Sequence, residues 1–460
     1  MWDVVVVGGG HNGVIAAITL ARHGLRVAVV EKNPWPGGLA GGLPQGVPLS
    51  LYAYAVGLVP RELDEWLGLL KGLLHKPDPS WVEVEDGEVT LRWWRSRGRL
   101  SLEAEEAGAP GLPHLLHLVD EFWRCYKAAG LYYTPSPPSP ADAASMVDGC
   151  SSEAAGVLER SVESILREYL DPSWWPTVIY PSMLESNGFA LAYYLQNGGV
   201  WDQPVGGMAS LSRRLAMLAR SEGVTLVTGE AASDILVEGG RAAGAELASG
   251  KRLRARLAVV YSAPIYTLPR LPTPAGILGE DRIKALRRME ESRVWVRRVD
   301  YLLSKPPRPP REPGWRGYPI ISSWVGDVGG EYTYPSLYSS TSLHVVQASG
   351  PMRPLDPAPP GVDERDIVAW WERGPESQAV CCGNTTGHPD HVPLRDPFIM
   401  DGRPLQGWHD YTTDIPGLYH ASASSYPGGE INGVAGHNAA LRILLDAGVR
   451  PLSPLYRGPG

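Results

Sequence analysis

Residues 3–13 read DVVVVGGGHNG and carry the strongest structural signal in the chain. The four valines form an unbroken β-branched run, as expected of a strand buried on both faces of a parallel sheet. The glycine cluster after them fits the pattern GxGxxG, and the apolar spacing predicts a helix from Val14 to His23. A second apolar run, LRVAVV at 25–30, ends at Glu31. Together these segments predict a complete βαβ unit.

Each part of this unit has a mechanical role in binding a dinucleotide. Gly8 makes the tight turn, Gly10 lets a pyrophosphate approach the backbone, and Gly13 lets helix and strand pack closely. The helix N-terminus supplies N–H groups to the anion. Glu31 would accept hydrogen bonds from a ribose diol, and its charge would repel a 2′-phosphate. The competing interpretation is a glycine-rich turn in another α/β protein, but strand, helix, second strand and acid are all in place.

A second glycine patch indicates which dinucleotide is bound. Lys32 is followed by PGGLAGG at 36–42, where a nicotinamide dehydrogenase would normally continue into another strand and helix. A second glycine loop suits a longer cofactor that lies against extended chain. We find no second GxGxxG preceded by a strand, so a dedicated NAD domain is not expected.

Three blocks of sequence resemble one known family. The first block spans 4–42, the second starts with GGMASL at 206–211 and ends with LAVVYSA at 257–263, and the third runs from IPGLYHASAS at 415–424 into PGGEING at 427–433. In this order they resemble the FAD-binding parts of the phytoene-desaturase-related flavoproteins, within the wider amine-oxidase-like group. The third block resembles the motif that closes over the flavin, and a helix is expected from about Gly436.

The resemblance implies an α/β fold: a discontinuous, Rossmann-like FAD-binding domain of the glutathione-reductase type with an inserted α+β substrate domain. It places the FAD-binding domain at 1–70, 196–274 and 396–450, the substrate domain at 71–195 and 275–395, and a C-terminal tail at 451–460. It also implies non-covalent FAD. The residues expected to bind it are Gly8, Gly10, His11, Asn12, Gly13, Glu31, Lys32, Gly37, Gly38, Leu39, Ala40, Ala232, Ala263, Ala423, Ser424, Ile431, Asn432 and Val434.

Two positions depart from the wider group. Many relatives carry a carboxylate that bonds the ribityl chain where Ala423 stands, so backbone or water must do that work here. Some desaturases carry a histidine where this chain has Tyr426, so no acid–base role of that histidine can be transferred. The catalytic residues therefore stay unknown at this stage.

Composition excludes several classes of protein. The formal charge is −8 at pH 7, and no long basic run exists, which argues against nucleic-acid binding. Four cysteines in 460 residues are too few for a disulfide scaffold. No uncharged apolar run reaches about 18 residues, and no signal peptide is evident. We expect a soluble, reduced, cytoplasmic protein that makes at most peripheral contact with a membrane. The apolar stripe at 59–74 would serve such a contact, but packing on its own domain is favoured.

Two clusters outside the blocks invite a functional interpretation that we do not favour. The run HPDH at 388–391 and the pair His409-Asp410 offer metal-ligand types, but the proline breaks helical ligand spacing, so loop residues and no metal are expected. Cys381 and Cys382 are expected to be buried thiols on a strand rather than a vicinal disulfide. Paired aromatics such as Tyr193-Tyr194 are expected in the core more than along a substrate tunnel.

The first hypothesis for function is an FAD-dependent oxidoreductase that desaturates or saturates an apolar isoprenoid- or polyene-like substrate by hydride transfer at flavin N5. The alternatives are an FAD-dependent amine oxidase, which usually has an aromatic cage before the flavin, and a non-catalytic flavoprotein that acts as a binding partner. The expected partner is an apolar small molecule. The electron acceptor is unknown, with oxygen and quinone both open.

Overall fold

The fold is taken from a computed structural model of the 460-residue chain. It describes residues 1–41, 52–53, 55–75, 80–86, 89–95, 108–179, 183–196, 203–205, 207–291, 297–308, 321–325, 328–334, 343–350, 358–387 and 390–456.

A seven-stranded sheet is built around the glycine-rich N-terminus. Its strand order is β7-β2-β1-β10-β9-β8, with β16 paired to β10. The strands β7, β2, β1, β10 and β16 pair in parallel, whereas β9 and β8 continue from β10 as an antiparallel meander. Their bounds are β1 (Trp2–Val7), β2 (Val27–Glu31), β7 (Thr225–Thr228), β8 (Ala232–Glu238), β9 (Arg241–Leu247), β10 (Arg252–Tyr261) and β16 (Leu418–His420).

The predicted βαβ unit is confirmed within this sheet. Val4, Val5 and Val6 are completely buried, as expected for a central parallel strand covered on both faces. The helix α1 (His11–Ala21) starts three residues earlier than predicted, because Gly10 is its N-cap and the glycine loop leads straight into the first turn. Helices α9 (Met208–Ser221) and α13 (Val434–Asp446) pack against α1.

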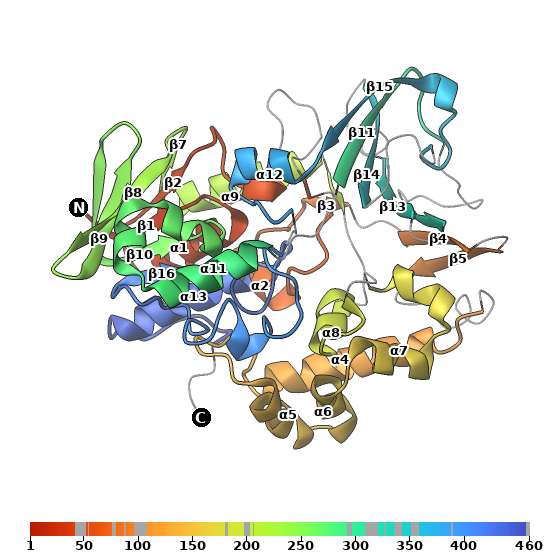
Figure 1. Cartoon of the computed structure of the whole chain (residues 1–460), viewed down its shortest axis with the longest axis horizontal. Helices are drawn as coiled ribbons and strands as arrows, with labels where there is room; N and C mark the ends of the chain where they lie inside the picture. Colours follow the sequence, from red (N-terminus) through yellow and green to blue (C-terminus); the bar gives the residue numbers. More distant parts are fainter. Residues whose placement is uncertain are drawn as a thin grey trace.

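A second seven-stranded sheet has the order β15-β11-β14-β13-β12-β4-β5, and all its pairs are antiparallel except β12 with β4. Figure 1 shows it at the opposite end of the molecule from β8 and β9. Its strands are β4 (Ser80–Asp86), β5 (Val89–Arg95), β11 (Arg297–Leu303), β12 (Ile321–Val325), β13 (Val328–Thr333), β14 (His344–Gly350) and β15 (Ile367–Arg373).

A group of helices lies below the second sheet (Figure 1). They are α4 (Leu112–Ala128), α5 (Pro140–Asp148), α6 (Ser152–Glu159), α7 (Val162–Tyr169) and α8 (Phe189–Leu195). The aromatic pairs of this region are buried, as favoured from the sequence: Tyr132, Tyr133, Trp174, Trp175, Tyr193 and Tyr194. Trp370 and Trp371 on β15 are instead 44% and 36% exposed.

Short elements connect these layers. They are η1 (Gly38–Ala40), α2 (Arg61–Leu67), β3 (Leu74–His75), η2 (Pro172–Thr177), β6 (Gln203–Pro204), η5 (Ile265–Arg270), α10 (Pro272–Ile277), α11 (Glu280–Glu291), η7 (Glu364–Asp366), α12 (Pro375–Cys382) and η8 (Met400–Gly402).

The first sheet takes its strands from the three segments assigned to FAD binding, and the second takes its strands from the two segments assigned to substrate. The α/β fold class is thereby confirmed, while the domain boundaries themselves stay a prediction. Helix α2 turns Leu63 and Leu67 into the core, so the apolar stripe there packs on its own chain. No helix in the described parts of the chain is long and apolar enough to cross a membrane.

The expectation of reduced cysteines is wrong. Cys125 on α4 and Cys150 just after α5 form a disulfide, and so do Cys381 and Cys382. The second pair lies at the end of helix α12, not on a strand. Sequence spacing gives no indication of the first bond, because only tertiary packing brings Cys125 to Cys150. For the adjacent Cys381 and Cys382 a vicinal disulfide is the alternative that the sequence analysis does not favour, and the structure has it.

Candidate cofactor site

One cavity follows the carboxyl edge of the first sheet, where β1, β2 and β10 end. Its empty volume is about 1470 Å³ when the space open to solvent is included. The predicted cofactor-binding residues that line it are Gly8, Gly10, His11, Asn12, Glu31, Lys32, Gly37, Gly38, Leu39, Ala40, Ala232, Ala263, Ala423 and Ile431. Residues from all three sequence blocks thus share one wall.

In the first glycine loop, Gly10 has open space beside it, whereas Gly8 and Gly13 are closely packed. Gly8 has φ +103°, and a Cβ there would come within 3.0 Å of the Ala263 nitrogen. A Cβ on Gly13 would lie 2.7 Å from the Ser262 hydroxyl and closer still to the Gly8 carbonyl. A Cβ on Gly10 would meet nothing within 4 Å, so this face of the loop opens into the cavity. Next to it, the first-turn N–H groups of α1 have no partner within the helix.

Glu31 ends β2 with its carboxylate at the cavity. Oε2 accepts a hydrogen bond from the Gly9 N–H at 2.8 Å, and Oε1 accepts two from Asn33, both at 2.8 Å. Burial raises the pKa of Glu31, against the lowering effect of these three hydrogen bonds. A carboxylate held this way keeps lone pairs for the hydroxyls of a ribose.

His11 is the first residue of α1 and supplies a test of whether a cofactor fits. Its Nε2 is buried and has no hydrogen-bond partner among the described residues, while the ring also faces the Glu430 backbone. Burial lowers the pKa of His11 to about 4, so the ring is neutral at pH 7. A buried polar atom at a cavity wall is costly unless a ligand or water satisfies it. The site therefore fits a polar ligand group such as those along FAD.

The second glycine loop docks on the first. The Gly37 N–H donates to the Gly9 carbonyl at 2.7 Å, and Gly37 also bridges to Gly10. Gly37 and Gly38 have φ of +131° and +58°, in the region that favours glycine. This conformation lets η1 lie along the cavity instead of starting another strand, which agrees with a long cofactor.

Four predicted residues lie behind the cavity wall: Gly13, Ser424, Asn432 and Val434 are absent from the lining. Asn432 is occupied by its own loop, since its Nδ2 donates to the Gly429 carbonyl at 2.6 Å and its Oδ1 accepts from the Val434 N–H at 2.7 Å. Its side chain therefore stabilises the loop of the third block and does not face the cavity. Binding by any of the predicted residues stays a prediction.

Sequence reasoning missed His391. The sequence predicts an ordinary loop residue there, yet His391 is buried, lines the cavity and has φ +60°, which is uncommon for a residue with a side chain. Its Nδ1 lies 3.4 Å from the Ser424 hydroxyl. His388 and Pro389 of the same run lie outside the described residues. No local pattern marks His391, because it reaches the cavity only through the loop that precedes the third block.

Arg403 holds that loop in place. It is completely buried and donates only to backbone carbonyls. Nη2 bonds those of Asp390 at 2.9 Å, Val392 at 3.1 Å and Ala423 at 2.6 Å. Two of these residues flank His391 in sequence, so Arg403 fixes the unusual backbone there against the third block.

Tyr426 points away from the cavity. Its hydroxyl donates to the Leu131 carbonyl at 2.8 Å, so the Tyr126 hydroxyl, also at 2.8 Å, must donate to it. Burial raises the pKa of both phenols far from neutrality. This residue joins the third block to α4 and cannot replace the histidine of some desaturases as an acid or base.

Comparison with known proteins agrees with this architecture. Residues 3–73 match the family model of the FAD dependent oxidoreductases. The chain is 29% identical over 264 residues to an uncharacterized protein of Mycobacterium tuberculosis, which covers 50% of this chain and 47% of that protein. The chain thus spans about half the length of that relative.

Two further comparisons reach most of the chain. Hydroxyneurosporene desaturase of Cereibacter sphaeroides is 26% identical over 423 residues, covering 87% of this chain and 76% of the desaturase. The solved structure of cyclohexylamine oxidase from Brevibacterium oxydans superposes with a TM-score of 0.56 at 18% identity, covering 97% of this chain and 99% of the oxidase. The latter likeness shows the fold alone.

Proposed function

We propose that this chain, which belongs to the FAD-dependent oxidoreductases, desaturates or saturates a carbon–carbon bond of an apolar isoprenoid- or polyene-like substrate. The observation that carries the proposal is the similarity to a hydroxyneurosporene desaturase over 87% of the chain. A match over 423 residues extends far beyond the length of the nucleotide-binding unit alone. The likeness to cyclohexylamine oxidase is one of fold and gives no support for an amine substrate.

The make-up of the cavity supports this chemistry. FAD supplies hydride transfer when it is bound, and hydride transfer from a hydrocarbon makes little demand on strong acids or bases. Glycine and apolar side chains form much of the wall. The charged residues of the wall are Glu31, Lys32 and Glu430. Glu31 is hydrogen-bonded to Gly9 and Asn33, and Lys32 Nζ donates to the Val380 carbonyl at 2.6 Å. Glu31 and Lys32 would hold the nucleotide end of the cofactor.

The chain's own contribution is therefore binding, orientation and exclusion of water. The glycine loops and the N-terminus of α1 would hold the phosphates, and Glu31 would hold the ribose. Buried tyrosines behind the third block, Tyr126 and Tyr426, stay neutral because burial raises the pKa of each. They provide a rigid apolar support rather than a proton.

The experiment is an anaerobic reaction of the purified holoprotein with a panel of polyenes and amines. The flavin band at about 450 nm should bleach with an isoprenoid polyene, and the product should differ from the substrate by two hydrogens. If the enzyme works toward saturation, a chemically reduced holoprotein should reoxidise on addition of the polyene. Bleaching by amines alone would assign the amine oxidase alternative, and a flavin unresponsive to the whole panel would favour a binding role.

A further inference from the structure

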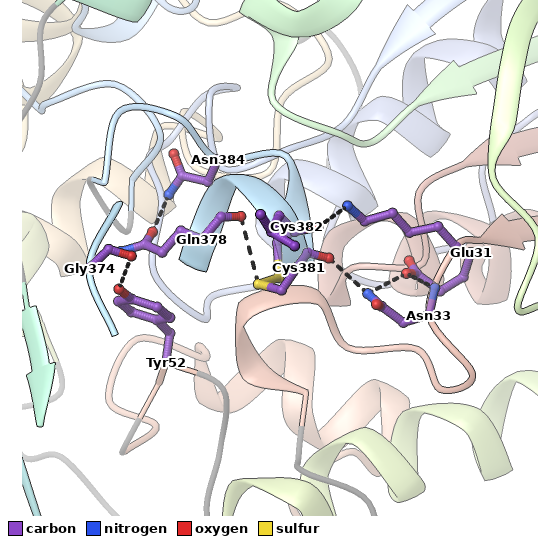
Figure 2. Close-up of a disulfide and its surroundings, with 10 residues drawn as sticks. Glu31, Asn33, Tyr52, Gly374, Gln378, Cys381, Cys382 and Asn384 are labelled. Atoms are coloured by element: carbon purple, nitrogen blue, oxygen red, sulfur yellow. Dashed lines mark hydrogen bonds between the residues drawn. A yellow bond between two sulfur atoms is a disulfide. The ribbon is translucent and has the colours of Figure 1, made fainter. Parts of the chain in front are cut away.

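Helix α12 covers part of the cofactor cavity although it is more than 300 residues from the glycine loop in sequence. Its first end is tied down by Tyr52, whose hydroxyl donates to the Gly374 carbonyl at 2.7 Å. Its last turn is tied down by Lys32 through the Val380 carbonyl. Tyr52, Lys32 and Cys382 all line the cavity. Figure 2 shows Tyr52 beside Gly374 at the start of the helix and Asn33 beside Cys381 at its end. The helix thus contributes its last residue, Cys382, to the cavity wall and is fastened at both ends.

A continuous set of hydrogen bonds leads from α12 to the ribose-binding carboxylate. Asn33 Nδ2 donates to the Cys381 carbonyl at 3.0 Å and to Glu31 Oε1 at 2.8 Å (Figure 2). Glu31 in turn accepts from the Gly9 N–H. The last carbonyls of a helix have no partner within it, so those of Val380 and Cys381 are available for these contacts. The last turn of α12 therefore helps to position Asn33 and, through it, Glu31, the group expected to hold the ribose in the adenosine half of FAD.

The disulfide between Cys381 and Cys382 lies in this last turn, and Gly383 ends the helix with φ +73°. A bond between neighbouring side chains closes a small ring that includes the backbone between them. The ring restricts the backbone that carries the Cys381 carbonyl. Both cysteines are only half-buried, so a small thiol can reach them.

We propose that Cys381 and Cys382 form a thiol–disulfide exchange site that sets how firmly α12 holds the FAD. The inference rests on the FAD binding assumed in the proposed function. In the oxidised state the ring keeps the Cys381 carbonyl directed at Asn33 and stiffens the turn next to the Val380 carbonyl, which accepts from Lys32. In the reduced state the last turn gains freedom, these contacts weaken, and the cofactor leaves faster.

The reductant is a dithiol, either a small molecule or a protein of the dithiol oxidoreductase class. One of its thiolates attacks one sulfur of the pair, forms a mixed disulfide and releases the other cysteine as a thiolate. The second thiol of the reductant then displaces the remaining cysteine. The protein gains two electrons and two protons, and the reductant leaves as a disulfide.

The second disulfide provides a matched control within the same chain. Cys125 and Cys150 join α4 to the end of α5, and neither cysteine lines the cavity. A reductant that opens both bonds therefore changes the cavity wall only through Cys381 and Cys382. The variants Cys381→Ser/Cys382→Ser and Cys125→Ala/Cys150→Ser separate the two contributions.

The test measures the rate at which FAD leaves the oxidised and the reduced holoprotein, followed by the fluorescence of free flavin after dilution. Loss of about one net hydrogen bond should speed release about tenfold after reduction. The Cys125→Ala/Cys150→Ser variant should keep this response. The Cys381→Ser/Cys382→Ser variant should release FAD at the fast rate with or without reductant.

Hydrogen exchange gives a second readout that does not depend on flavin. Amides of 375–383 should exchange faster in the reduced wild type than in the oxidised one. Equal release rates in both redox states, or a full response in the Cys381→Ser/Cys382→Ser variant, would overturn the inference while leaving FAD binding intact. A protein that takes up no FAD in either state would instead overturn the proposed function.

Discussion

At the scale of single residues, Glu31 has the most demanding position in the site. The residue is 6% exposed, and its carboxylate accepts from three N–H donors, two of them from the backbone. An amide in its place can accept from one side only, since its NH₂ group faces a donor on the other side. The position therefore requires a carboxylate even before a ribose binds.

The first prediction is that Glu31→Gln weakens FAD binding by about tenfold to a hundredfold, because one buried backbone donor loses its acceptor and the ribose loses a charged one. Titration of the apoprotein with FAD by fluorescence measures the change. Wild-type affinity should also fall on acidification, through a pKa that burial places above the ordinary 4.5. Unchanged affinity in Glu31→Gln would show that the ribose is held elsewhere.

At the scale of elements, Gly10 and Gly13 of the first glycine loop have different roles. The absent side chain of Gly13 lets α1 pack on β1 and β10, whereas that of Gly10 leaves open space at the cavity. The pattern GxGxxG alone does not tell which glycine is needed for packing and which for access of the ligand. The atoms around each Cα distinguish the two roles.

The second prediction compares Gly13→Ala with Gly10→Ala. The first should lower the free energy of unfolding of the apoprotein by about 3 kcal/mol, because its Cβ overlaps backbone that cannot move away. The second should leave that free energy within about 0.5 kcal/mol of wild type and still abolish tight FAD binding. Urea denaturation and FAD titration on both variants check this. The reverse order of effects would refute the division of roles.

The third prediction concerns Arg403, which joins two loops through backbone carbonyls alone. Arg403→Lys should lower the free energy of unfolding by about 3 kcal/mol, since an ammonium has three donors where the guanidinium uses five and buried carbonyls lose their partners. Urea denaturation measures the loss. Arg395→Lys, in the same loop but exposed, is the matched control and should be near neutral. Equal stability of both variants would mean that water replaces the guanidinium.

At the scale of the whole molecule, buried histidines connect stability to pH. His11, His420 and His437 come from different segments, and burial lowers the pKa of each to about 4. His420 is a fixed neutral tautomer, because Nε2 donates to the Trp408 carbonyl at 2.7 Å and leaves Nδ1 to accept from the Ser425 hydroxyl. The unfolded chain regains the ordinary pKa of 6.5 at these positions.

The fourth prediction follows from the sign of these shifts. The contribution of these histidines to the free energy of unfolding is complete above pH 6.5 and is lost as the pH falls toward 4. In that range the histidines bind protons in the unfolded state but stay neutral in the folded state. Between pH 6 and 5 the denaturation midpoint should decrease steadily. His420→Gln should reduce the uptake of protons on unfolding by about one in this window. A midpoint independent of pH over that range would show that the rings are protonated in the folded protein.

The nucleotide-binding unit was readable from the sequence because its parts are neighbours in the chain. A buried parallel strand, a GxGxxG turn and an acid at the end of the next strand lie within residues 3–31, and each constrains the next through local geometry. The segments that contain α9, α13 and the strands around them were instead identified through the family resemblance of the second and third blocks. The second glycine loop predicted a longer cofactor without a dedicated NAD domain, and the family resemblance implied that this cofactor is FAD.

Tertiary structure alone decided what completes the cavity. His391, the position of helix α12 and the Cys125–Cys150 disulfide depend on contacts between segments that local patterns do not relate, such as Asn33 with Cys381 or Arg403 with Asp390. Local sequence determines the backbone hydrogen bonds of a turn or strand, whereas the partner of a side chain depends on how whole layers pack. For this reason the sequence predicted the cofactor cradle, and only the folded chain revealed what covers it.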